Sequence, residues 1–370
     1  RRVHGEAITM LGLLLFSFIL VGEANGCLPS DLAALASLKS SLYEPSLGIF
    51  DTWIGTNCSS WYGVSCDTKT GQVVLLELRG ESEDEILTRR GKYTRGVMYG
   101  SISPSVCSLK HLTGLVIADW KGISKRIPEC VSSLTSLKVL DFSGNNLTGS
   151  VPVGMGKLKR LSVLSLANNR ISGPLPKSFP GLVGLKHLDL SNNQISGSLD
   201  GLAGLTMLSR ALLANNRFCG SIPYSMRSMV RLSDLDLSMN YISGCLPGWL
   251  AGLPYLSTLN LDSNRFTGRV PPNFLSCSGL GILNLSRNGL EGQLPDTFSP
   301  DTYFMVLDLS YNKLNGSIPS SLTKAKFIGH LDVSHNHLCG PIPGGSACEH
   351  LEASSFKDND CLCGAPLGAC

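Results

Sequence analysis

The sequence predicts an α/β, right-handed solenoid of short stacked repeats, and three observations support that prediction. The first is an Asn that recurs every 24 residues, once after 23, over most of the chain. The second is the pattern LxxLxL that precedes it. The third is the composition of the 370 residues, with 40 Gly and only 16% charged residues, against about 25% charged residues in typical domains. A repeat accounts for this composition better than two or three ordinary domains do. The recurring residues are Asn145, Asn169, Asn193, Asn216, Asn240, Asn264, Asn288, Asn312 and Asn336.

Each repeat encodes a short strand, a turn and a return segment. The alternation in LxL places the leucines inward and the middle residue outward, as in a β-strand. Strands of successive repeats then stack in parallel about 4.8 Å apart, which forms a concave sheet over one continuous core. The recurring Asn can satisfy backbone groups at the turn, so we interpret it as structural. The following Gly and Pro permit the turn and discourage a long helix.

Residues 1–26 predict a secretory signal peptide. A basic start precedes an apolar stretch from Met10 to Val21, and Ala24 and Gly26 provide the small residues of a cleavage site. That stretch is too short to cross a bilayer and no later one is long enough, so we expect a secreted, extracellular protein without a membrane span. All 13 Cys follow residue 26, as expected for an oxidising compartment, and their odd number leaves at least one thiol without an intramolecular partner.

The rest of the chain divides into an N-terminal cap at 27–72, about eleven repeats at 73–343 and a C-terminal cap at 344–370. The caps are needed because terminal repeats otherwise expose the core. A charged insert at 79–96 interrupts the first repeat, and it is either a solvated loop or a loop that contacts a partner. Another repeat is irregular because Trp120 replaces the Asn and one residue is inserted after it.

The N-terminal cap is predicted to begin with a helix. Asp31 is a suitable N-cap residue, and Pro45 would end the helix. The residues expected on its apolar face are Leu32, Leu35, Leu38 and Leu42.

The caps and repeats resemble those of plant extracellular leucine-rich-repeat proteins. The segment CSSWYGVSC at 58–66 resembles their N-terminal cap motif. Units such as NNLTGSVP at 145–152 are similar to the plant-specific repeat of polygalacturonase inhibitors and receptor-kinase ectodomains. The more specific segments are similar to a group named for DNA-damage repair/toleration, and they are LGIFDTW, VIADWKGI, AKFIGHLDVSHN and DNDCLCGAPL.

The resemblance implies most of the disulfide pairs. Asn57 stands where the family has a Cys that pairs back to the N-terminus, so Cys27 would lack its usual partner. The pairs that the resemblance implies are Cys58–Cys66, Cys339–Cys361 and Cys363–Cys370.

Another pair follows from the repeat itself. Cys107 and Cys130 occupy nearly equivalent positions of neighbouring turns, whose spacing of about 5 Å suits a disulfide. The cysteines without an evident partner are Cys219, Cys245, Cys277 and Cys348.

Enzyme signatures are absent from the sequence, which lacks GxSxG, HExxH and GxxxxGK[ST]. We therefore expect a protein that is not an enzyme and that needs no cofactor and no metal. The net charge of +3 provides no field that would recruit nucleic acid.

The candidate binding residues form a column, because the middle residue of LxL recurs on the outward face of each strand. Five members are Asp, and the column is either an inherited consensus or a surface that attracts a basic partner. The candidate partner-binding residues are Asp141, Asp189, Asp236, Asn260, Asp308 and Asp332. Asn146, Asn284 and Asn315 head glycosylation sequons. A glycan on Asn284 would obstruct this face.

The leading functional hypothesis is a secreted recognition protein that binds an extracellular protein or a cell-wall polysaccharide in plant defence or stress. The alternatives are polygalacturonase inhibition, a DNA-damage or stress-tolerance role without direct nucleic-acid contact, and ice binding. The last would need a flat array of hydroxyl groups, and Thr is sparse and unphased.

Overall fold

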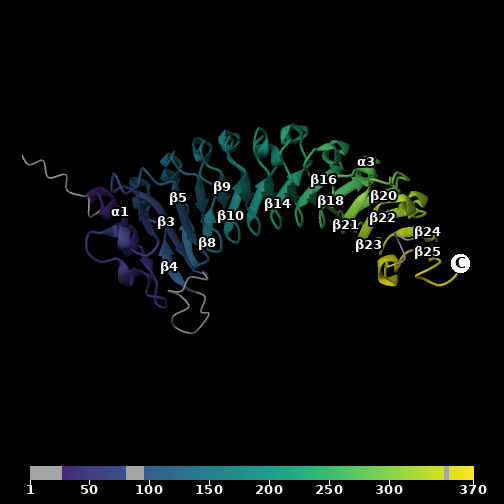
Figure 1. Ribbon diagram of the computed structural model, residues 1–370, viewed down its shortest axis with the longest axis horizontal. Helices are drawn as coiled ribbons and strands as arrows, with labels where there is room; N and C mark the ends of the chain where they lie inside the picture. The colour runs from purple at the N-terminus through teal and green to yellow at the C-terminus, as the bar shows by residue number, and fades with distance from the viewer. Residues whose placement is uncertain (1–26, 81–95, 346–349) are drawn as a thin grey trace, which may run out of the picture.

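The computed structural model describes residues 27–80, 96–345 and 350–370. The predicted signal peptide, most of the charged insert and Cys348 lie outside the described residues. The described chain forms an arch of stacked turns, with the N-terminal cap at one end and the C-terminal cap at the other (Figure 1). No helix in these residues combines the length and the apolar character needed to cross a bilayer.

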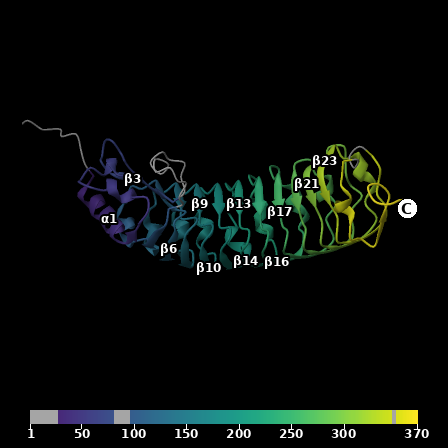
Figure 2. The same cartoon turned by 90° about the horizontal axis from the view of Figure 1, so that it is seen from below.

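The first sheet lines the inside of the arch, where its strands lie side by side (Figure 2). It is parallel apart from β2, which pairs antiparallel with β3 at the N-terminal end. This confirms the predicted solenoid with a concave parallel sheet. Its strands are β2 (Val64–Cys66), β3 (Val73–Arg79), β5 (Gly114–Ala118), β7 (Val139–Asp141), β9 (Val163–Ser165), β11 (His187–Asp189), β13 (Arg210–Leu212), β15 (Asp234–Asp236), β17 (Thr258–Asn260), β19 (Ile282–Asn284), β21 (Tyr303–Asp308) and β23 (Phe327–Asp332).

A second sheet, absent from the sequence-based expectation, is formed by the residues that follow each turn. In these segments the Leu or Ile of NxLxGxIP is buried and its neighbours are not, so the segment also alternates as a strand does. Its strands are β1 (Leu42–Tyr43), β4 (Met98–Ser101), β6 (Lys121–Arg126), β8 (Asn146–Gly149), β10 (Arg170–Pro174), β12 (Gln194–Gly197), β14 (Arg217–Gly220), β16 (Tyr241–Cys245), β18 (Arg265–Gly268), β20 (Gly289–Gln293), β22 (Lys313–Gly316), β24 (His337–Pro341) and β25 (Cys361–Cys363).

Short helical turns on the outside of the arch close most repeats. In most units the Pro precedes or begins such a turn, and an apolar residue after it returns the chain to the core. The helices are α1 (Pro29–Ser40) and α3 (Asn273–Ser276). The 3₁₀ turns are η1 (Ile49–Thr52), η2 (Cys58–Ser60), η3 (Pro104–Ser108), η4 (Glu129–Ser133), η5 (Met155–Lys157), η6 (Phe179–Gly181), η7 (Leu199–Leu202), η8 (Tyr224–Ser228), η9 (Gly248–Gly252), η10 (Ser320–Lys324) and η11 (Ala353–Phe356).

The recurring Asn residues connect neighbouring turns, as predicted. Asn240 is typical: its Oδ1 accepts from the backbone N–H of Phe218 at 3.0 Å, in the preceding turn. Its Nδ2 donates to the carbonyl of Leu213 at 3.0 Å, also in the preceding turn, and to two carbonyls of its own turn. The side chain is buried and all of these groups are satisfied, so the ladder holds the stack in register.

The irregular repeat around Trp120 breaks this ladder once. The indole Nε1 of Trp120 donates to the carbonyl of Leu78 at 2.9 Å, which replaces the donor bond of the missing Asn. The extra residue in that turn displaces the N–H that Asn145 should accept. Asn145 Oδ1 is consequently the one buried side-chain oxygen or nitrogen in the described residues without a hydrogen-bond partner.

The N-terminal helix differs from its prediction in where it begins and ends. It starts at Pro29, and its N-cap residue is Leu28, so Asp31 does not cap it. Asp31 is instead buried, and its Oδ2 accepts from the N–H of Val73 at 2.9 Å, which fastens the helix to β3. The helix stops at Ser40, and Leu42 is buried in β1 rather than on the helix.

The disulfide framework corrects one expected pair. The structure contains Cys107–Cys130, Cys339–Cys361 and Cys363–Cys370. The expected Cys58–Cys66 bond is wrong, because Cys58 is bonded to Cys27 and Cys66 is a free thiol. A hydrogen bond from the N–H of Cys27 to the carbonyl of Thr56 at 3.2 Å places Cys27 beside Cys58, so Asn57 does not deprive Cys27 of a partner. Cys219, Cys245 and Cys277 are also free.

Candidate functional site

The outward-facing column of the concave sheet is continuous in the structure. Each member is the register partner of the next across neighbouring parallel strands, and every member is half-buried. The residues in order are Asp141, Ser165, Asp189, Leu212, Asp236, Asn260, Asn284, Asp308 and Asp332.

Each Asp of the column uses one carboxylate oxygen to hold the turn after its strand. Oδ1 of Asp236 accepts from the N–H of Ser238 at 3.0 Å and from its hydroxyl at 2.6 Å. The column is therefore partly structural, as the consensus interpretation expects. The same arrangement recurs in Asp141–Ser143, Asp189–Ser191 and Asp308–Ser310, and with the N–H alone in Asp332–Ser334.

The two ends of the column differ in whether the second carboxylate oxygen of each Asp, Oδ2, has a partner. At the N-terminal end, Arg79 Nη2 lies 3.1 Å from Asp141 Oδ2, and Arg79 also pairs with Glu77 at 2.9 Å. Burial alone would lower the pKa of Arg79, but Glu77 and Asp141 raise it, so the guanidinium stays charged. Toward the C-terminal end, no donor in the described part of the chain reaches Oδ2 of Asp236 or Asp308.

The charge is concentrated in the C-terminal half of the sheet. The first-sheet strands β15, β17, β19, β21 and β23 contain no Lys or Arg, whereas β3 and β13 contribute Arg79 and Arg210. We call this half the acidic surface. Its carboxylates are Asp234, Asp236, Asp262, Asp308 and Asp332, with Asn260 and Asn284 between them.

Asp262 belongs to this surface although the sequence analysis did not select it. It follows β17 in the turn, at a position where the other repeats have Ser or Ala. This departure from the repeat pattern could have identified Asp262 from the sequence. Asn284 Nδ2 donates to its Oδ1 at 3.3 Å and the Ser263 hydroxyl donates to its Oδ2 at 3.1 Å. Burial raises the pKa of Asp262, and repulsion by Asp236 and Asp308 raises it further. The acidic surface therefore holds its negative charge against mutual repulsion, which a cationic ligand would relieve.

A stacked array of side chains borders the acidic surface at the C-terminal turns. The guanidinium of Arg287 lies 4.0 Å from the ring centre of Tyr311, and the Tyr311 and His335 rings stack with their centres 4.0 Å apart. His335 Nε2 lies 3.2 Å from Asp358 Oδ2. These residues occupy the same place in successive turns, so the array gives the surface a rigid aromatic rim.

The sequon residues differ in their surroundings. Asn315 is exposed, and Asn146 is half-buried at the start of β8. Asn284 lies within the acidic surface, where its Oδ1 accepts from Ser286 and its Nδ2 donates to Asp262. Glycosylation of these three residues stays a prediction.

Two hollows among the described residues lie away from the acidic surface. A polar depression of ≈ 530 Å³ beside the irregular repeat is lined by residues that include Asp119, Lys121 and Arg170. Within the described ranges the one cluster with metal-ligand geometry is Cys27, Cys58 and Cys66, two of which form a disulfide. The candidate site is an open sheet face.

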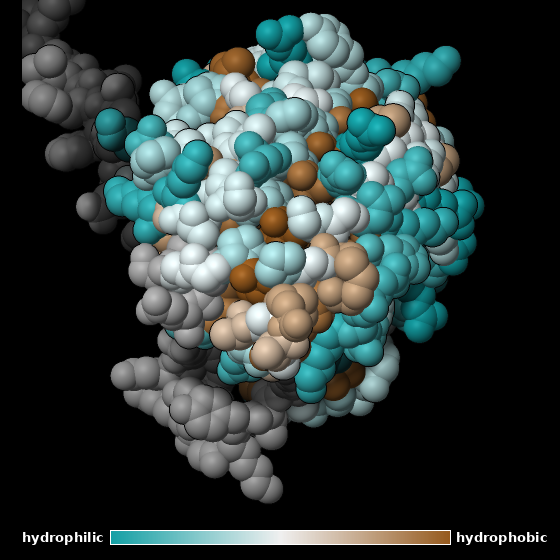
Figure 3. All heavy atoms as spheres, turned by 90° about the vertical axis from the view of Figure 1, so that its right-hand side faces the viewer, coloured by the Kyte–Doolittle hydropathy of each residue, from teal (hydrophilic) through white to brown (hydrophobic). Residues whose placement is uncertain are grey.

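The C-terminal end of the solenoid is closed by the cap. Phe356 in η11 is buried, and the N–H of Val333 donates to the carbonyl of Ser355 at 2.9 Å, so η11 covers the edge of β23. Seen from this end, the surface is mostly hydrophilic, with hydrophobic residues gathered in a narrower band (Figure 3). The acidic surface is therefore open along the sheet and closed at the end of the stack.

Family models match much of the chain. The model described as leucine rich repeat N-terminal domain matches 28–67. One model described as leucine rich repeat matches 159–218 and 212–266. A second model with the same description matches 136–158, 279–300 and 304–325.

Curated relatives match parts of the chain. DNA damage-repair/toleration protein DRT100 of Arabidopsis thaliana is 52% identical over 141 residues, which are 38% of this chain and 37% of that protein. The probable LRR receptor-like serine/threonine-protein kinase RPK1 of the same plant is 34% identical over 164 residues, which are 41% of this chain and 30% of that protein. The chain thus matches well under half the length of these relatives.

Solved structures match over nearly the whole chain. A plant ice-binding protein has a TM-score of 0.65 and 28% identity, covering 93% of this chain and 98% of that one. The ectodomain of the Arabidopsis receptor kinase HAESA, in complex with an extended IDA peptide hormone, has a TM-score of 0.66 and 27% identity. That match covers 90% of this chain and 61% of the HAESA chain.

Proposed function

We propose that this chain, a plant leucine-rich-repeat protein of the extracellular type, is a recognition protein that binds a basic peptide or protein segment through its acidic surface. The observation that supports this proposal most is the set of outward carboxylates on the first-sheet strands β15, β21 and β23, in a run of five first-sheet strands (β15, β17, β19, β21 and β23) that contain no Lys or Arg. A matching positive partner would gain attraction and faster association there.

The geometry favours an extended ligand. The acidic surface runs along five neighbouring strands, β15 to β23, and strands in such a sheet lie about 4.8 Å apart. A peptide laid across the strands would meet Asp236 and, three strands further on, Asp308 and then Asp332. The HAESA ectodomain, which shares this fold, is described in complex with a peptide hormone. Acidic cell-wall polysaccharides would be repelled by the same carboxylates.

The proposal makes the protein a binding module and not an enzyme. The matching family models describe leucine rich repeats and their N-terminal domain, and the carboxylates of the acidic surface lie on an open sheet face. Any downstream signal would then come from the bound partner or from a further protein. A role in plant defence or stress fits such a module.

Affinity capture from plant cell-wall extract tests the proposal. The bait is the chain, and the matched variant carries Asp236→Asn, Asp308→Asn and Asp332→Asn, which keep each Oδ1 acceptor for the turn. Because each of these changes creates an Asn-x-Ser sequon, wild type and variants are all produced in a host without N-glycosylation. A control variant carries Asp51→Asn, Asp200→Asn and Asp301→Asn at exposed positions outside the column. We expect wild type and control to retain the same basic secreted species and the column variant to lose it. Equal capture by all three would contradict the proposal.

Ice binding is a second candidate because of one observation. Asn168, Asn192 and Asn215 expose a row of amides, each hydrogen-bonded to the next at 2.9 Å, and a plant ice-binding protein shares the fold. The row ends at Met239, so it spans few turns. Thermal hysteresis of the purified chain would support this candidate, and its absence would remove it.

Two further alternatives are tested by activity. If the chain inhibits polygalacturonase, adding it to the fungal enzyme must lower pectin cleavage, and an unchanged rate excludes that role. The stress-tolerance alternative involves no direct DNA contact, so any DNA binding should be weak and lost at physiological salt, and tight, salt-resistant binding would contradict it.

A further inference from the structure

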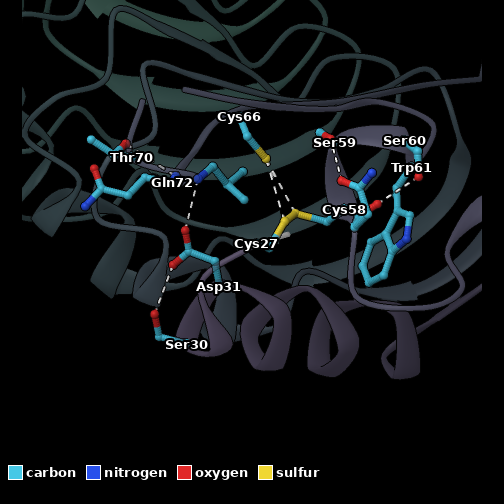
Figure 4. The surroundings of a disulfide bond; sticks show 12 residues. Cys27, Ser30, Asp31, Cys58, Ser59, Ser60, Trp61, Cys66, Thr70 and Gln72 are labelled. Atoms are coloured by element: carbon cyan, nitrogen blue, oxygen red, sulfur yellow. Dashed lines mark hydrogen bonds between the residues drawn. A yellow bond between two sulfur atoms is a disulfide. The ribbon is translucent and has the colours of Figure 1, made fainter. Parts of the chain in front are cut away.

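Three cysteine sulfurs meet in the N-terminal cap. Cys27 and Cys58 form a disulfide, and the free Sγ of Cys66 lies 3.7 Å from the first sulfur and 3.5 Å from the second (Figure 4). The three sulfurs lie within 4.8 Å of one another. Three cysteines can share only one disulfide among themselves, so one thiol always remains in this cluster.

Backbone contacts hold all three positions together whichever pair is bonded. Cys27 is anchored by its N–H bond to Thr56, and Cys58 lies in η2 with a fully buried side chain. Cys66 ends β2, where it is the register partner of Val73 in β3. The proximity of Cys66 to the disulfide is therefore set by the sheet and the cap, and it does not depend on the Cys27–Cys58 bond alone.

We propose that Cys27, Cys58 and Cys66 form a disulfide-exchange site, in which Cys66 displaces one partner and the cap interconverts between isomers. The Cys66 thiol gives its proton to solvent, and its thiolate attacks Cys58 Sγ. A Cys58–Cys66 bond forms as the Cys27–Cys58 bond breaks, and Cys27 leaves as a thiolate that takes up a proton. One disulfide and one thiol are present before and after, so no oxidant or reductant is consumed.

The two attack directions have different consequences for the cap. Attack on Cys58 frees Cys27, which is half-buried just before α1, and removes the covalent tie between that helix and η2. Attack on Cys27 leaves the free thiol on Cys58, which is fully buried. Because Cys66 lies beside the bond at similar distances from both sulfurs, its side chain must turn into line with either one before it attacks.

The surroundings of Cys66 hold it in the thiol form near neutral pH, so the exchange becomes faster as the pH rises and the thiol ionises. Burial raises the pKa of the Cys66 thiol, and the carboxylate of Asp31 on α1 raises it further. Cys27 and Cys58 face it as a neutral disulfide, and Asp67 follows it in the chain. Below the thiol pKa the attacking thiolate, and with it the exchange rate, increases about tenfold for each pH unit.

Disulfide mapping of the full chain tests the proposal. The protein is folded under oxidising conditions, incubated at pH 6 or pH 8.5, quenched with acid, alkylated with N-ethylmaleimide and digested for mass spectrometry. We expect both Cys27–Cys58 and Cys58–Cys66 peptides, with the mixture reached at least tenfold faster at pH 8.5. A single Cys27–Cys58 linkage with alkylated Cys66 at both pH values would overturn the proposal.

Single Cys→Ser variants distinguish disulfide exchange from a cap with one fixed disulfide. Cys27→Ser should contain a Cys58–Cys66 bond, and Cys66→Ser should be fixed as Cys27–Cys58. Cys277→Ser removes a half-buried free thiol elsewhere in the solenoid and should leave the mixture unchanged. Circular dichroism confirms that each variant is folded. A folded Cys27→Ser protein with both remaining cap thiols reduced would contradict the proposal.

Discussion

The side-chain amide of Asn284 donates to Asp262 Oδ1 at 3.3 Å, which joins a glycosylation sequon to the acidic surface. Asn284 is also held from the other side, because its Oδ1 accepts from the N–H of Ser286 at 3.1 Å and from its hydroxyl at 2.7 Å. An N-linked glycan on this residue would stand over the face that we propose as the binding surface.

The first prediction concerns that glycan. For the acidic surface to be open, Asn284 must be unmodified, whereas the exposed Asn315 is free to carry a glycan. Glycopeptide mass spectrometry of the protein secreted from plant cells should find Asn315 occupied and Asn284 bare. High occupancy at Asn284 would rule out binding across the acidic surface.

The second prediction concerns Asp262, whose pKa is raised by burial and by Asp236 and Asp308. A carboxyl whose pKa is higher in the folded than in the unfolded chain binds its proton more tightly when folded. Its ionised form therefore costs stability, and the cost grows as the pH rises through the two pKa values. Asp262→Asn, which keeps the Oδ1 acceptor for Asn284, should raise the melting temperature at pH 7 and have little effect at pH 3.

Asp200→Asn is the control for this experiment, because Asp200 is exposed and outside the acidic surface. Its melting temperature should follow that of the wild type at both pH values. An Asp262→Asn protein that is less stable than wild type at pH 7 would contradict the second prediction.

The third prediction concerns Glu44 in the N-terminal cap. Burial alone would raise its pKa, but hydrogen bonds from the N–H groups of Leu47, Ser46 and Gly48 and from the Ser46 hydroxyl lower it. A carboxyl whose pKa is lower in the folded than in the unfolded chain stabilises the fold at pH values above its unfolded-state pKa. That stabilisation is lost as the pH falls through its folded-state pKa. Glu44→Gln should cost about 1–2 kcal/mol at pH 7.

The loss at Glu44 should shrink as the pH falls through the folded-state pKa, because the wild-type carboxyl then becomes protonated as well. Urea unfolding at pH 7 and at a pH below the folded-state pKa measures it, with the exposed Glu352→Gln as control. A loss that is equal at both pH values would show that the ionised carboxylate is not what stabilises this turn.

The fourth prediction compares two buried Asn residues of the ladder. The Oδ1 of Asn240 accepts a hydrogen bond from the N–H of Phe218 in the preceding turn. The Oδ1 of Asn145 has no such partner. Replacing Asn240 by Ala leaves that N–H unpaired, so it should cost about 1–3 kcal/mol more than Asn145→Ala. Urea unfolding followed by circular dichroism provides the comparison, and an equal or larger loss at Asn145 would contradict it.

Much of the fold could be predicted from the sequence because each repeat specifies its own strand and turn through residues that are close together in the chain. The phase of the Asn residues and of LxL determines both the strands and the outward column, and each Asn contact is repeated from turn to turn. The second sheet was missed because its strands lie in segments rich in Gly and Pro, which are typical of turns. Asp31 was misassigned because a side chain suited to an N-cap formed a distant bond to Val73 instead.

The candidate site was predictable in position and less so in composition. The column could be read from the middle residue of LxL, but its division into a paired and an unpaired end depends on Arg79, 62 residues before Asp141 in the chain. The ring stack from Arg287 to His335 depends on which residues face one another across turns. Cys58 is bonded to Cys27 and not to the expected Cys66, and this too depends on a contact that no motif encodes, the hydrogen bond from Cys27 to the carbonyl of Thr56.

The central claim is that the acidic surface binds a basic ligand, and titration of an arginine-rich peptide into the purified chain tests it most directly. We expect saturable binding that weakens as salt is raised. The variant with Asp236→Asn, Asp308→Asn and Asp332→Asn, produced like the others in a host without N-glycosylation because each change creates a sequon, should bind about tenfold more weakly, a loss of about 1.4 kcal/mol. The variant with Asp51→Asn, Asp200→Asn and Asp301→Asn, which has the same net charge, should bind as the wild type does. Equal affinity of the two variants would contradict the account.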